Sequence, residues 1–516
     1  MAQVYAFQIY HSDGWRSNDK ADKKNFSGRW TYKFSDQFQA SLNLRAYNGN
    51  WEAPGNISHL RRNKTDHVDD GSGEGGGGFR DRYDGRLWAN YFINDESQLT
   101  FYLYGTSMET TRHEVNDVAS WPVTGNEFGG GEDYSRHKSW GTGLTYNFKG
   151  DINGKAATAT VGFTYSYELE DPRVFYNYVQ GGGRRRGSIG RYAEQLSINN
   201  PAILAEVSYQ VHEMFNIRLG SRYDWIYGKY RDLRPTSANF NQEIESDTYG
   251  IASPKVGVLF TPTDRLSFYA NFGRGFSLPS MSGGADGFYA NNSFALKVRD
   301  QYEIGSRATV TDWLDLELAL FKVNTKNDTS YDYDTNRTVA AGTTERHGLE
   351  FSALFKPSAD WSINTNYSFT RGKYKSFTDT SNNKLDGYKM TNIPAHMLNF
   401  ELMIHPENYP FGARITYHGE YDRYSRNMPS QRLNGQLNQV PKQKAPNFEI
   451  VDVMLYYKIN DNYRILFNVN NLFDKEYYTG LSHGLPDPNT GDWVGQRRPP
   501  RTFYLTLEMN WDKKEL

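Results

Sequence analysis

The sequence contains no cysteine in its 516 residues, which excludes disulfide frameworks and metal sites built from thiolates. It also lacks the run of about 18 consecutive apolar residues that a membrane-spanning helix needs. The formal net charge is only −2, which argues against a nucleic-acid-binding protein with a concentrated basic face. The segment 1–7 shows no charged region, apolar region or cleavage site of a secretory signal. We therefore expect that the chain is incomplete at its start or that a signal has been removed.

Tyrosine and glycine are abundant, with 38 and 47 residues, and 15% of all residues are aromatic. This composition suits a fold with many strands and turns. The mean hydropathy of −0.76 would ordinarily indicate a soluble protein. However, only alternate residues of a barrel strand meet lipid, and long polar loops lower the average further. The composition is therefore compatible with a transmembrane β-barrel.

Two C-terminal segments alternate between apolar and polar residues with a period of two, which is typical of a transmembrane barrel strand. In the segment 463–470 the odd-numbered positions are Tyr, Ile, Phe and Val, whereas Arg464, Asn468 and Asn470 occupy even positions. In the segment 503–511 the odd-numbered positions are Phe, Leu, Leu, Met and Trp, and the even-numbered positions are Tyr, Thr, Glu and Asn. Both segments are predicted to be strands with one face toward lipid.

Similar alternating segments recur along the chain, joined by turns that are alternately short and long, as in outer-membrane barrels. The predicted short turns are 35–36, 94–96, 150–151, 212–213, 262–264, 311–312, 358–360, 406–408 and 460–461. The long connections, which we expect to be extracellular loops, are 47–80, 107–135, 169–196, 228–248, 275–297, 326–341, 373–390, 420–446 and 474–500. We predict an all-β fold, a transmembrane antiparallel β-barrel with short periplasmic turns. We count about 20 such strands in the sequence, whereas the large plugged transporters have 22.

Several short motifs occur in an order that is similar to TonB-dependent outer-membrane receptors of the siderophore-receptor type. The segment 269–279 has the form Y…G-F…P, 301–306 contains E-x-G, 346–350 contains G-x-E, and 498–503 is a proline-arginine entry into the last strand. The remaining family-motif residues are Asn468, Asn470, Asn471, Leu472, Phe473, Arg501 and the final aromatic Trp511.

The resemblance implies that residues 1–516 are the β-barrel of such a receptor, in the outer membrane of a Gram-negative bacterium. It also implies that the signal peptide, the N-terminal plug, the TonB box and the first hairpin are absent. The full form would take up a scarce solute, for which we expect a ferric siderophore, with energy from the TonB complex. Further implied partners are outer-membrane lipid, lipopolysaccharide and the barrel assembly machinery. We expect no cofactor, no nucleic acid and no enzymatic activity.

Candidate ligand contacts are cationic and aromatic residues in the predicted loops, because these groups suit an anionic iron chelate. The same residue types also bind lipopolysaccharide phosphates or form solvated loop faces, so these alternatives stay open. The candidates are Arg173, Tyr176, Tyr178, Arg184, Arg185, Arg186, Tyr289, Tyr421, Arg423 and Tyr424, with Arg426 beside the last cluster.

Two further segments suggest metal binding only weakly. Asp332 begins a calcium-loop-like segment, but Arg337 occupies the position that requires Gly and Thr343 the position that requires Glu, so an EF-hand is excluded. His67 and the acidic pair 69–70 could bind a metal or simply solubilise a loop. No P-loop, zinc-protease motif or nucleophile elbow is present.

Three alternatives compete with an energised importer. A passive porin without a plug, or a truncated receptor without function, would have the same strand pattern. A plug-coding segment upstream of the chain would exclude the porin. A soluble β-propeller would explain the strands and the tyrosine content, but it requires a blade-length repeat that the sequence does not show.

Overall fold

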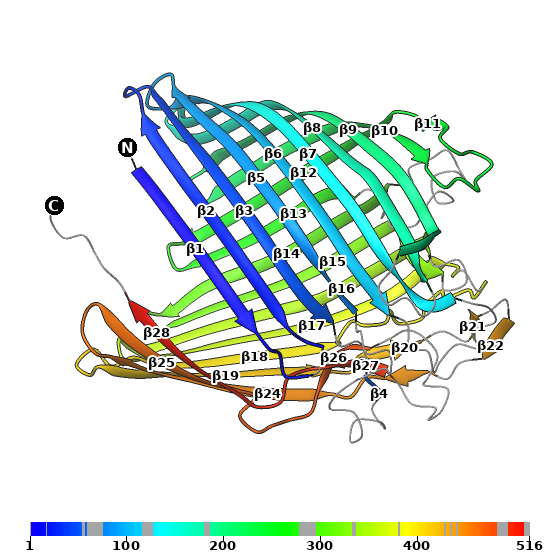
Figure 1. The fold of residues 1–516 in the computed structure, drawn as a ribbon. Helices are drawn as coiled ribbons and strands as arrows, with labels where there is room; N and C mark the ends of the chain where they lie inside the picture. Colours follow the sequence, from blue (N-terminus) through cyan, green and yellow to red (C-terminus); the bar gives the residue numbers. More distant parts are fainter. Residues whose placement is uncertain are drawn as a thin grey trace.

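The computed structural model describes residues 2–16, 18–53, 57–58, 76–115, 127–179, 186–277, 296–332, 337–379, 382–427, 430–433, 436–439, 442–481 and 494–509. These residues form one large β-sheet that curves into a barrel wall, with short strands gathered at one end (Figure 1). Its 21 strands include β11 (Glu243–Glu245), which pairs only with β10, so twenty strands form the wall. All their pairings are antiparallel. The all-β antiparallel barrel of about 20 strands is confirmed.

The wall strands follow one another in chain order. They are β1 (Ala2–Ser12), β2 (Ala21–Lys33), β3 (Phe38–Ala53), β5 (Gly76–Phe92), β6 (Ser97–Val115), β7 (Glu127–Ile152), β8 (Lys155–Val179), β9 (Arg186–His212), β10 (Phe215–Asp232), β12 (Tyr249–Thr263), β13 (Leu266–Ser277), β14 (Lys297–Thr311), β15 (Leu314–Asp332), β16 (Arg337–Ser358), β17 (Trp361–Phe377), β18 (His396–Ile404), β19 (Phe411–Tyr421), β24 (Phe448–Lys458), β25 (Tyr463–Asn470) and β28 (Thr502–Met509).

Seven short strands lie between wall strands and pair outside the wall. They are β4 (Ile57–Ser58), β20 (Tyr424–Arg426), β21 (Ser430–Leu433), β22 (Gln436–Gln439), β23 (Gln443–Lys444), β26 (Tyr478–Leu481) and β27 (Val494–Arg497). The pairing of β27 with β4 joins two parts of the chain that are far apart in sequence.

Nine short turns connect the hairpins of the wall, and eight lie at or within two residues of the predicted positions. The prediction at 150–151 is wrong, because β7 continues to Ile152 and the turn is formed by Asn153 and Gly154, both with positive φ. A two-residue hairpin turn of this type favours Asn-Gly, since both central residues adopt left-handed backbone angles.

Several predicted loops are shorter than expected, because the strands continue far beyond the membrane. The predicted loop 107–135 is largely strand, since β6 reaches Val115 and β7 begins at Glu127. β7, β8 and β9 contain 26, 25 and 27 residues, whereas a spanning barrel strand needs about 9–11. Paired strands satisfy backbone hydrogen bonds among polar residues equally well, so polarity alone does not end a strand.

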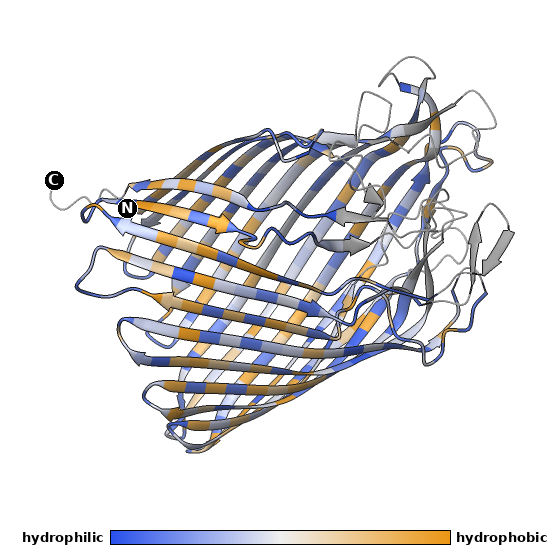
Figure 2. Ribbon diagram, turned by 90° about the horizontal axis from the view of Figure 1, so that it is seen from below, coloured by the Kyte–Doolittle hydropathy of each residue, from blue (hydrophilic) through white to orange (hydrophobic). Residues whose placement is uncertain are grey.

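The two faces of the wall differ in polarity, and Figure 2 shows the alternating hydrophobic and hydrophilic bands along the strands. On β15, Leu318 and Leu320 are 40% and 45% exposed, whereas Ala319 between them is 7% exposed. Register partners share a face, so Ile304 of β14 and Leu349 of β16 lie beside Leu320. This apolar outer face is the surface that meets lipid.

β1 and β28 form the two ends of the sheet. β1 pairs with β2 and β28 pairs with β25, and the described residues contain no pairing between β1 and β28. Figure 1 shows the two strands apart. Their side chains are strongly exposed, with 69% for Phe7 and 76% for Leu505. The described residues therefore do not close the barrel.

The family-motif residues after β25 build a capped turn. Asn471 has φ of 52° and is 3% exposed. Its backbone N–H donates to Asp452 Oδ1 at 2.7 Å, and its side-chain oxygen accepts from the Lys475 N–H at 2.8 Å. Arg501 donates from Nη1 to the Leu472 carbonyl at 3.2 Å, which ties the entry of β28 to this turn. Phe473 is 74% exposed, and Trp511 lies outside the described residues.

Candidate functional site

A first group of charged residues lies on the extensions of β7, β8 and β9. Arg173 is the register partner of Glu194, and its Nη1 lies 3.2 Å from Glu194 Oε1. Asp133 Oδ2 lies 3.8 Å from Arg173 Nη2, and the guanidinium lies 4.2 Å from the centroid of the Tyr192 ring. The Arg173 and Glu194 side chains are only 12% and 3% exposed. The charge of Arg173 is thus already neutralised within the wall.

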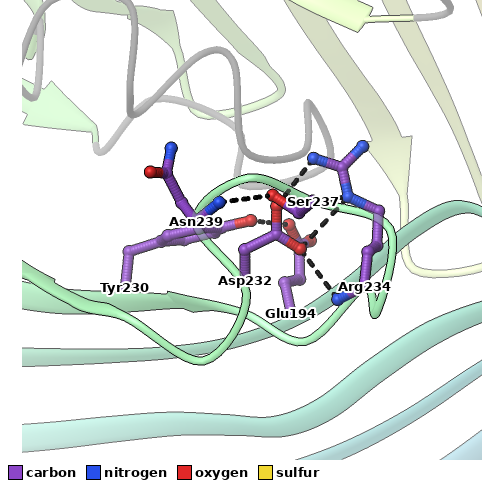
Figure 3. Close-up of polar contacts among 6 residues, drawn as sticks. All are labelled: Glu194, Tyr230, Asp232, Arg234, Ser237 and Asn239. Atoms are coloured by element: carbon purple, nitrogen blue, oxygen red, sulfur yellow. Dashed lines mark hydrogen bonds and ion pairs between the residues drawn. The ribbon is translucent and has the colours of Figure 1, made fainter.

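Figure 3 shows how this group continues onto β10 and the segment after it. The Tyr230 hydroxyl donates to Glu194 Oε2 at 3.3 Å. Asp232, which is 1% exposed, accepts from Arg234 Nη2 at 2.7 Å and from the Arg234 backbone N–H at 2.9 Å. The hydrogen bond with Asp232 raises the pKa of Arg234. These contacts fix the segment after β10 against the wall, which is a structural role.

Tyr176, Tyr178 and Arg186 form a separate group, because Tyr176 and Tyr178 point to the side of β8 opposite Arg173. Arg186 Nε donates to Glu132 Oε1 at 2.8 Å, and its guanidinium lies 4.8 Å from the Tyr176 ring centroid. Tyr178 is hydrogen-bonded to a histidine of β6 at 2.6 Å. The sequence placed all these residues in one cluster, and the structure separates them onto two faces. Arg184, Arg185 and Tyr289 lie outside the described residues.

The second predicted cluster, at 421–426, holds the loop strands together. Arg423 is 6% exposed and donates to the carbonyl groups of Tyr478 and Thr479 at 2.8 and 2.6 Å. The Tyr421 hydroxyl donates to Glu449 Oε1 at 3.0 Å. Two lysine ammonium groups lie 5.3 Å from the Tyr424 ring centroid. This network connects β19 with β26, so Arg423 acts as a clamp.

Those two lysines also hold a carboxylate outside the membrane-spanning strands. Lys389 Nζ lies 3.1 Å from Asp422 Oδ2, and Lys444 contacts Oδ1 of the same residue. The hydrogen bond from Lys444 lowers the pKa of Asp422. The charges of the cluster at 421–426, like those around Arg173, are therefore largely paired.

The lumen face of β2, β3 and β5 carries cations that the sequence analysis did not identify. We call them the arginine wall, and they are Arg29, Arg45, Arg82 and Arg86. The register places Arg29 beside Asn43, and Asn43 beside Arg86. This face lies opposite the exposed Leu44 and Leu87, which are 42% and 38% exposed on the apolar side. Among the described residues Arg82 pairs with Asp84 at 2.9 Å, whereas Arg86 has no carboxylate within 4 Å.

An open recess of about 480 Å³ lies against the arginine wall, lined in part by Asp84, Arg86, Tyr102 and Tyr104. The Arg86 guanidinium lies 4.6 Å from the Trp88 ring centroid and 5.7 Å from that of Tyr102. This geometry holds a planar cation against aromatic faces while its edge remains exposed to solvent. The recess can therefore bind an anion that also has a flat surface.

Glycines behind the two tyrosines make this geometry possible. Tyr102 and Tyr104 are flanked across the strand by Gly143 and Gly141 of β7. A Cβ atom at either glycine would lie 2.5 or 2.6 Å from the tyrosine ring atoms. In the sequence, these arginines stand at the polar positions of three successive alternating strands. That they lie close together becomes clear only when the strand registers are known.

The opposite sector of the lumen has more acidic side chains. β15 lies ten strands away from β3 in the order of the wall. Glu303, Glu317 and Glu350 lie on the polar face of β14, β15 and β16, and Arg307 Nε contacts Glu317 Oε1 at 2.9 Å. This sector carries both signs of charge, because Arg299 and Arg346 share the face with these glutamates. Cations predominate at the arginine wall, so an anion would be drawn there.

In the described part of the chain, no helix is long and apolar enough to cross a membrane. Nor do the described residues contain a group of three or more His, Asp or Glu side chains that could hold a metal ion. The metal alternative at His67 and 69–70 lies outside the described residues.

Comparison with solved structures supports the fold. The unliganded ferric citrate transporter FecA superposes with a TM-score of 0.78 at 16% identity, covering 98% of this chain and 73% of that one. The siderophore receptor PiuA from Acinetobacter baumannii gives 0.77 at 15% identity, with 98% and 77% covered. At these identities the likeness shows the fold alone.

Two curated relatives are similar in sequence. The metal-pseudopaline receptor CntO of Pseudomonas aeruginosa strain UCBPP-PA14 is 23% identical over 311 residues, which is 58% of this chain and 39% of that protein. A protein named "Probable TonB-dependent siderophore receptor PiuA", from Acinetobacter baumannii, is 22% identical over 499 residues, or 90% of this chain and 59% of that protein. The chain thus spans less than two thirds of the length of these relatives.

The profile of the family described as "TonB dependent receptor-like, beta-barrel" matches residues 5–472. This match includes most of the wall strands and agrees with their antiparallel order. Barrels of this family lie in the outer membrane of Gram-negative bacteria and serve as receptors, not as enzymes. The chain belongs to the family of TonB-dependent receptor-like β-barrels.

Proposed function

We propose that this chain is the barrel of an importer that takes up a scarce anionic metal chelate, a ferric siderophore, across the outer membrane. The observation that carries the proposal is the arginine wall beside the recess, where Arg86 lies over Trp88 and Tyr102. Ferric chelates with catecholate or carboxylate ligands are anionic, and the aromatic rings of catecholates are flat. They would receive charge-assisted hydrogen bonds and aromatic contact at this place.

Three relatives support this substrate class by their names: a metal-pseudopaline receptor, a siderophore receptor and a ferric citrate transporter. In the proposed function, Arg173 and Arg423 have structural roles. Tyr176, Tyr178 and Arg186 remain candidate contacts at the outer mouth, as do Arg184, Arg185, Tyr289, Tyr421 and Tyr424.

The proposed cycle needs more than the barrel. We propose that residues 1–516 act as one barrel domain of a longer receptor, whose plug and TonB box lie outside this sequence and couple release of the substrate to the TonB complex. The outer membrane has no energy source of its own, so directed uptake needs that coupling. Further proposed partners are outer-membrane lipid, lipopolysaccharide and the barrel assembly machinery. The last of these would recognise the terminal strand β28.

Binding of two chelates of different charge tests the proposal. The 516-residue chain in detergent would be titrated with an anionic ferric tris-catecholate and with a neutral ferric hydroxamate, following tryptophan fluorescence. We expect tighter binding of the anionic chelate, because only this chelate neutralises the arginine wall. Equal affinity for both, or no binding of either, would contradict the proposal.

A passive pore is the second candidate, favoured by the polar and charged residues on the lumen face of the described wall, such as Arg29, Asn43 and Arg86. Single-channel recording in planar bilayers separates the two functions. A steady conductance that a ferric chelate does not reduce would support the pore. A conductance no different from that of a protein-free bilayer would exclude it.

A further inference from the structure

A second open recess, of about 220 Å³, lies against the lumen face of β1, β2, β3 and β5. We call it the arginine recess, and it is lined in part by Val4, Ala6, Ser27, Arg29, Asn43 and Arg45. We call the larger recess beside Tyr102 and Tyr104 the tyrosine recess. Asp84 and Arg86 line both of them. These two side chains therefore form a ridge between the two recesses.

The strand registers explain why the two recesses lie side by side. One cross-strand row on the lumen face consists of Val4, Arg29, Asn43, Arg86 and Tyr104. The next row consists of Ala6, Ser27, Arg45, Asp84 and Thr106. Both recesses lie along these two rows, on opposite sides of β5. Two strand spacings separate Asn43 from Tyr104, which is about 10 Å. One ligand with two arms can therefore reach both recesses.

Two exposed cations dominate the arginine recess. Arg29 and Arg45 are diagonal neighbours on β2 and β3, a relation that places side chains about 7–8 Å apart. Arg45 Nε donates to Asn25 Oδ1 at 3.0 Å, which fixes the guanidinium at the recess. Within the described ranges, neither arginine forms an ion pair with a carboxylate. Two guanidinium groups at this spacing can donate to one carboxylate placed between them.

Asp84 is the carboxylate in the lining of the arginine recess, and it is the register partner of Arg45. Its two oxygens are already engaged by other donors. Arg82 Nε donates to Oδ1 and to Oδ2, both at 2.9 Å, and the Thr106 hydroxyl donates to Oδ1 at 2.8 Å. Asp84 thus balances the charge of Arg82. The recess keeps an excess of positive charge from Arg29 and Arg45.

The two recesses differ in the shape of the group that they suit. The tyrosine recess offers the faces of aromatic rings, whereas the described lining of the arginine recess contains no aromatic side chain. Its apolar part is small, since it consists of Val4 and Ala6 of β1 and the edge of Leu44. The arginine recess therefore suits a compact anionic group such as a carboxylate, and not a flat ring.

We propose that the arginine recess is a subsite for a carboxylate arm of the ligand, held between Arg29 and Arg45. The ligand is then a mixed chelate, with an aromatic arm in the tyrosine recess and a carboxylate arm about 10 Å away. An arm that is already held in one recess raises the effective concentration of the other arm, so the two contacts reinforce each other. The proposal rests on the proposed function, because it names the class of chelate that the same lumen wall would bind.

The test compares two ferric catecholate chelates that differ in one group. Each carries a pendant arm long enough to span about 10 Å, which ends in a carboxylate in one chelate and in its methyl ester in the other. The 516-residue chain in detergent is titrated with both, following tryptophan fluorescence. The carboxylate chelate should bind about 10- to 30-fold more tightly than the ester, the worth of one charge-assisted contact.

A pair of variants on β1 tests where the carboxylate binds. Val4 is 65% exposed and is the register partner of Arg29. Val4→Asp places a carboxylate beside Arg29, so it should remove most of the difference between acid and ester. Val4→Asn has nearly the same shape without the charge and should keep that difference. The double variant Arg29→Gln/Arg45→Gln should abolish it, whereas Arg307→Gln, which removes a lumen arginine paired with Glu317, should not.

Equal, measurable affinity of the parent chain for acid and ester would overturn the subsite and leave the proposed function intact. A preference for the acid that persists in Arg29→Gln/Arg45→Gln would also overturn it, since the carboxylate would then bind elsewhere. If neither chelate binds, the proposed function itself fails and the subsite falls with it. Should the double variant not fold, the comparison of Val4→Asp with Val4→Asn still decides.

Discussion

Two arginine-bearing regions of the barrel show how the same side chain can have different roles. Arg173 lies between Glu194 and Asp133 and is 12% exposed. Arg86 is exposed, stacks against Trp88, and has no carboxylate within 4 Å among the described residues. A cation that is paired with a buried carboxylate holds strands together, whereas a cation without one retains its charge for a ligand. In the proposed function, the number of neighbouring carboxylates therefore separates structural from ligand-binding arginines.

The largest expected effect is the loss of barrel stability when Arg173, the paired arginine, is replaced. Arg173→Met should destabilise the barrel by about 3 kcal/mol, because it leaves Glu194 buried and uncompensated. The urea unfolding midpoint in detergent measures this effect. The double variant Arg173→Met/Glu194→Leu should recover most of the stability. If the single variant unfolds at the parental midpoint, Arg173 is not structural and the comparison fails.

On the unpaired side, Arg86→Ala should leave the unfolding midpoint unchanged and weaken binding of an anionic ferric chelate about 10- to 30-fold, the worth of one charge-assisted hydrogen bond. Arg86→Lys should recover only part of the affinity, since lysine lacks the planar fork. Arg307→Ala is the matched control, because it removes a lumen arginine that is paired with Glu317. Equal losses of chelate affinity in Arg86→Ala and Arg307→Ala would show that the total positive charge of the lumen attracts the chelate, and that Arg86 is not part of a specific site.

Salt should weaken chelate binding at Arg86 more than it weakens the Arg173–Glu194 ion pair, although this effect is smaller than that of the substitutions. Raising the salt concentration from 50 to 500 mM shortens the screening length to well below 10 Å. Chelate binding at the exposed Arg86 should weaken about fivefold, while the buried Arg173–Glu194 pair is hardly screened. Parallel titrations and unfolding curves at both concentrations measure this. Salt-independent chelate binding would mean that charge does not hold the ligand.

The smallest expected effect concerns the support of Arg86. In Gly143→Ala the new Cβ atom would meet the Tyr102 ring at 2.5 Å, so the ring must move away from Arg86. We expect about threefold weaker chelate binding from lost cation–π contact, with no change of charge. Gly105→Ala is the control, since its Cβ atom would meet its nearest neighbour at 3.8 Å. Equal behaviour of the two variants would remove Tyr102 from the site.

The strand pattern was predictable from the sequence because each strand has a period of two and each short turn carries polar turn residues. The loop bounds were not, because β7, β8 and β9 continue through polar sequence. Local polarity does not reveal whether a neighbouring strand is present to accept backbone hydrogen bonds. The same reason explains why the turn after β7 lies at Asn153 and Gly154 instead of 150–151.

The alternation of apolar and polar residues was enough to predict a barrel of antiparallel strands, and the family motif that contains Asn471 could be recognised after the segment 463–470. Which polar residues meet could not be predicted, since cross-strand neighbours depend on register and are far apart in sequence. Arg29, Asn43 and Arg86 form one row only because three strands pair at fixed offsets. Arg173 and Tyr176 are three residues apart yet lie on opposite faces, because side chains of a strand alternate. Charge pairing across strands therefore distinguishes the paired Arg173 from Arg86, the proposed ligand contact.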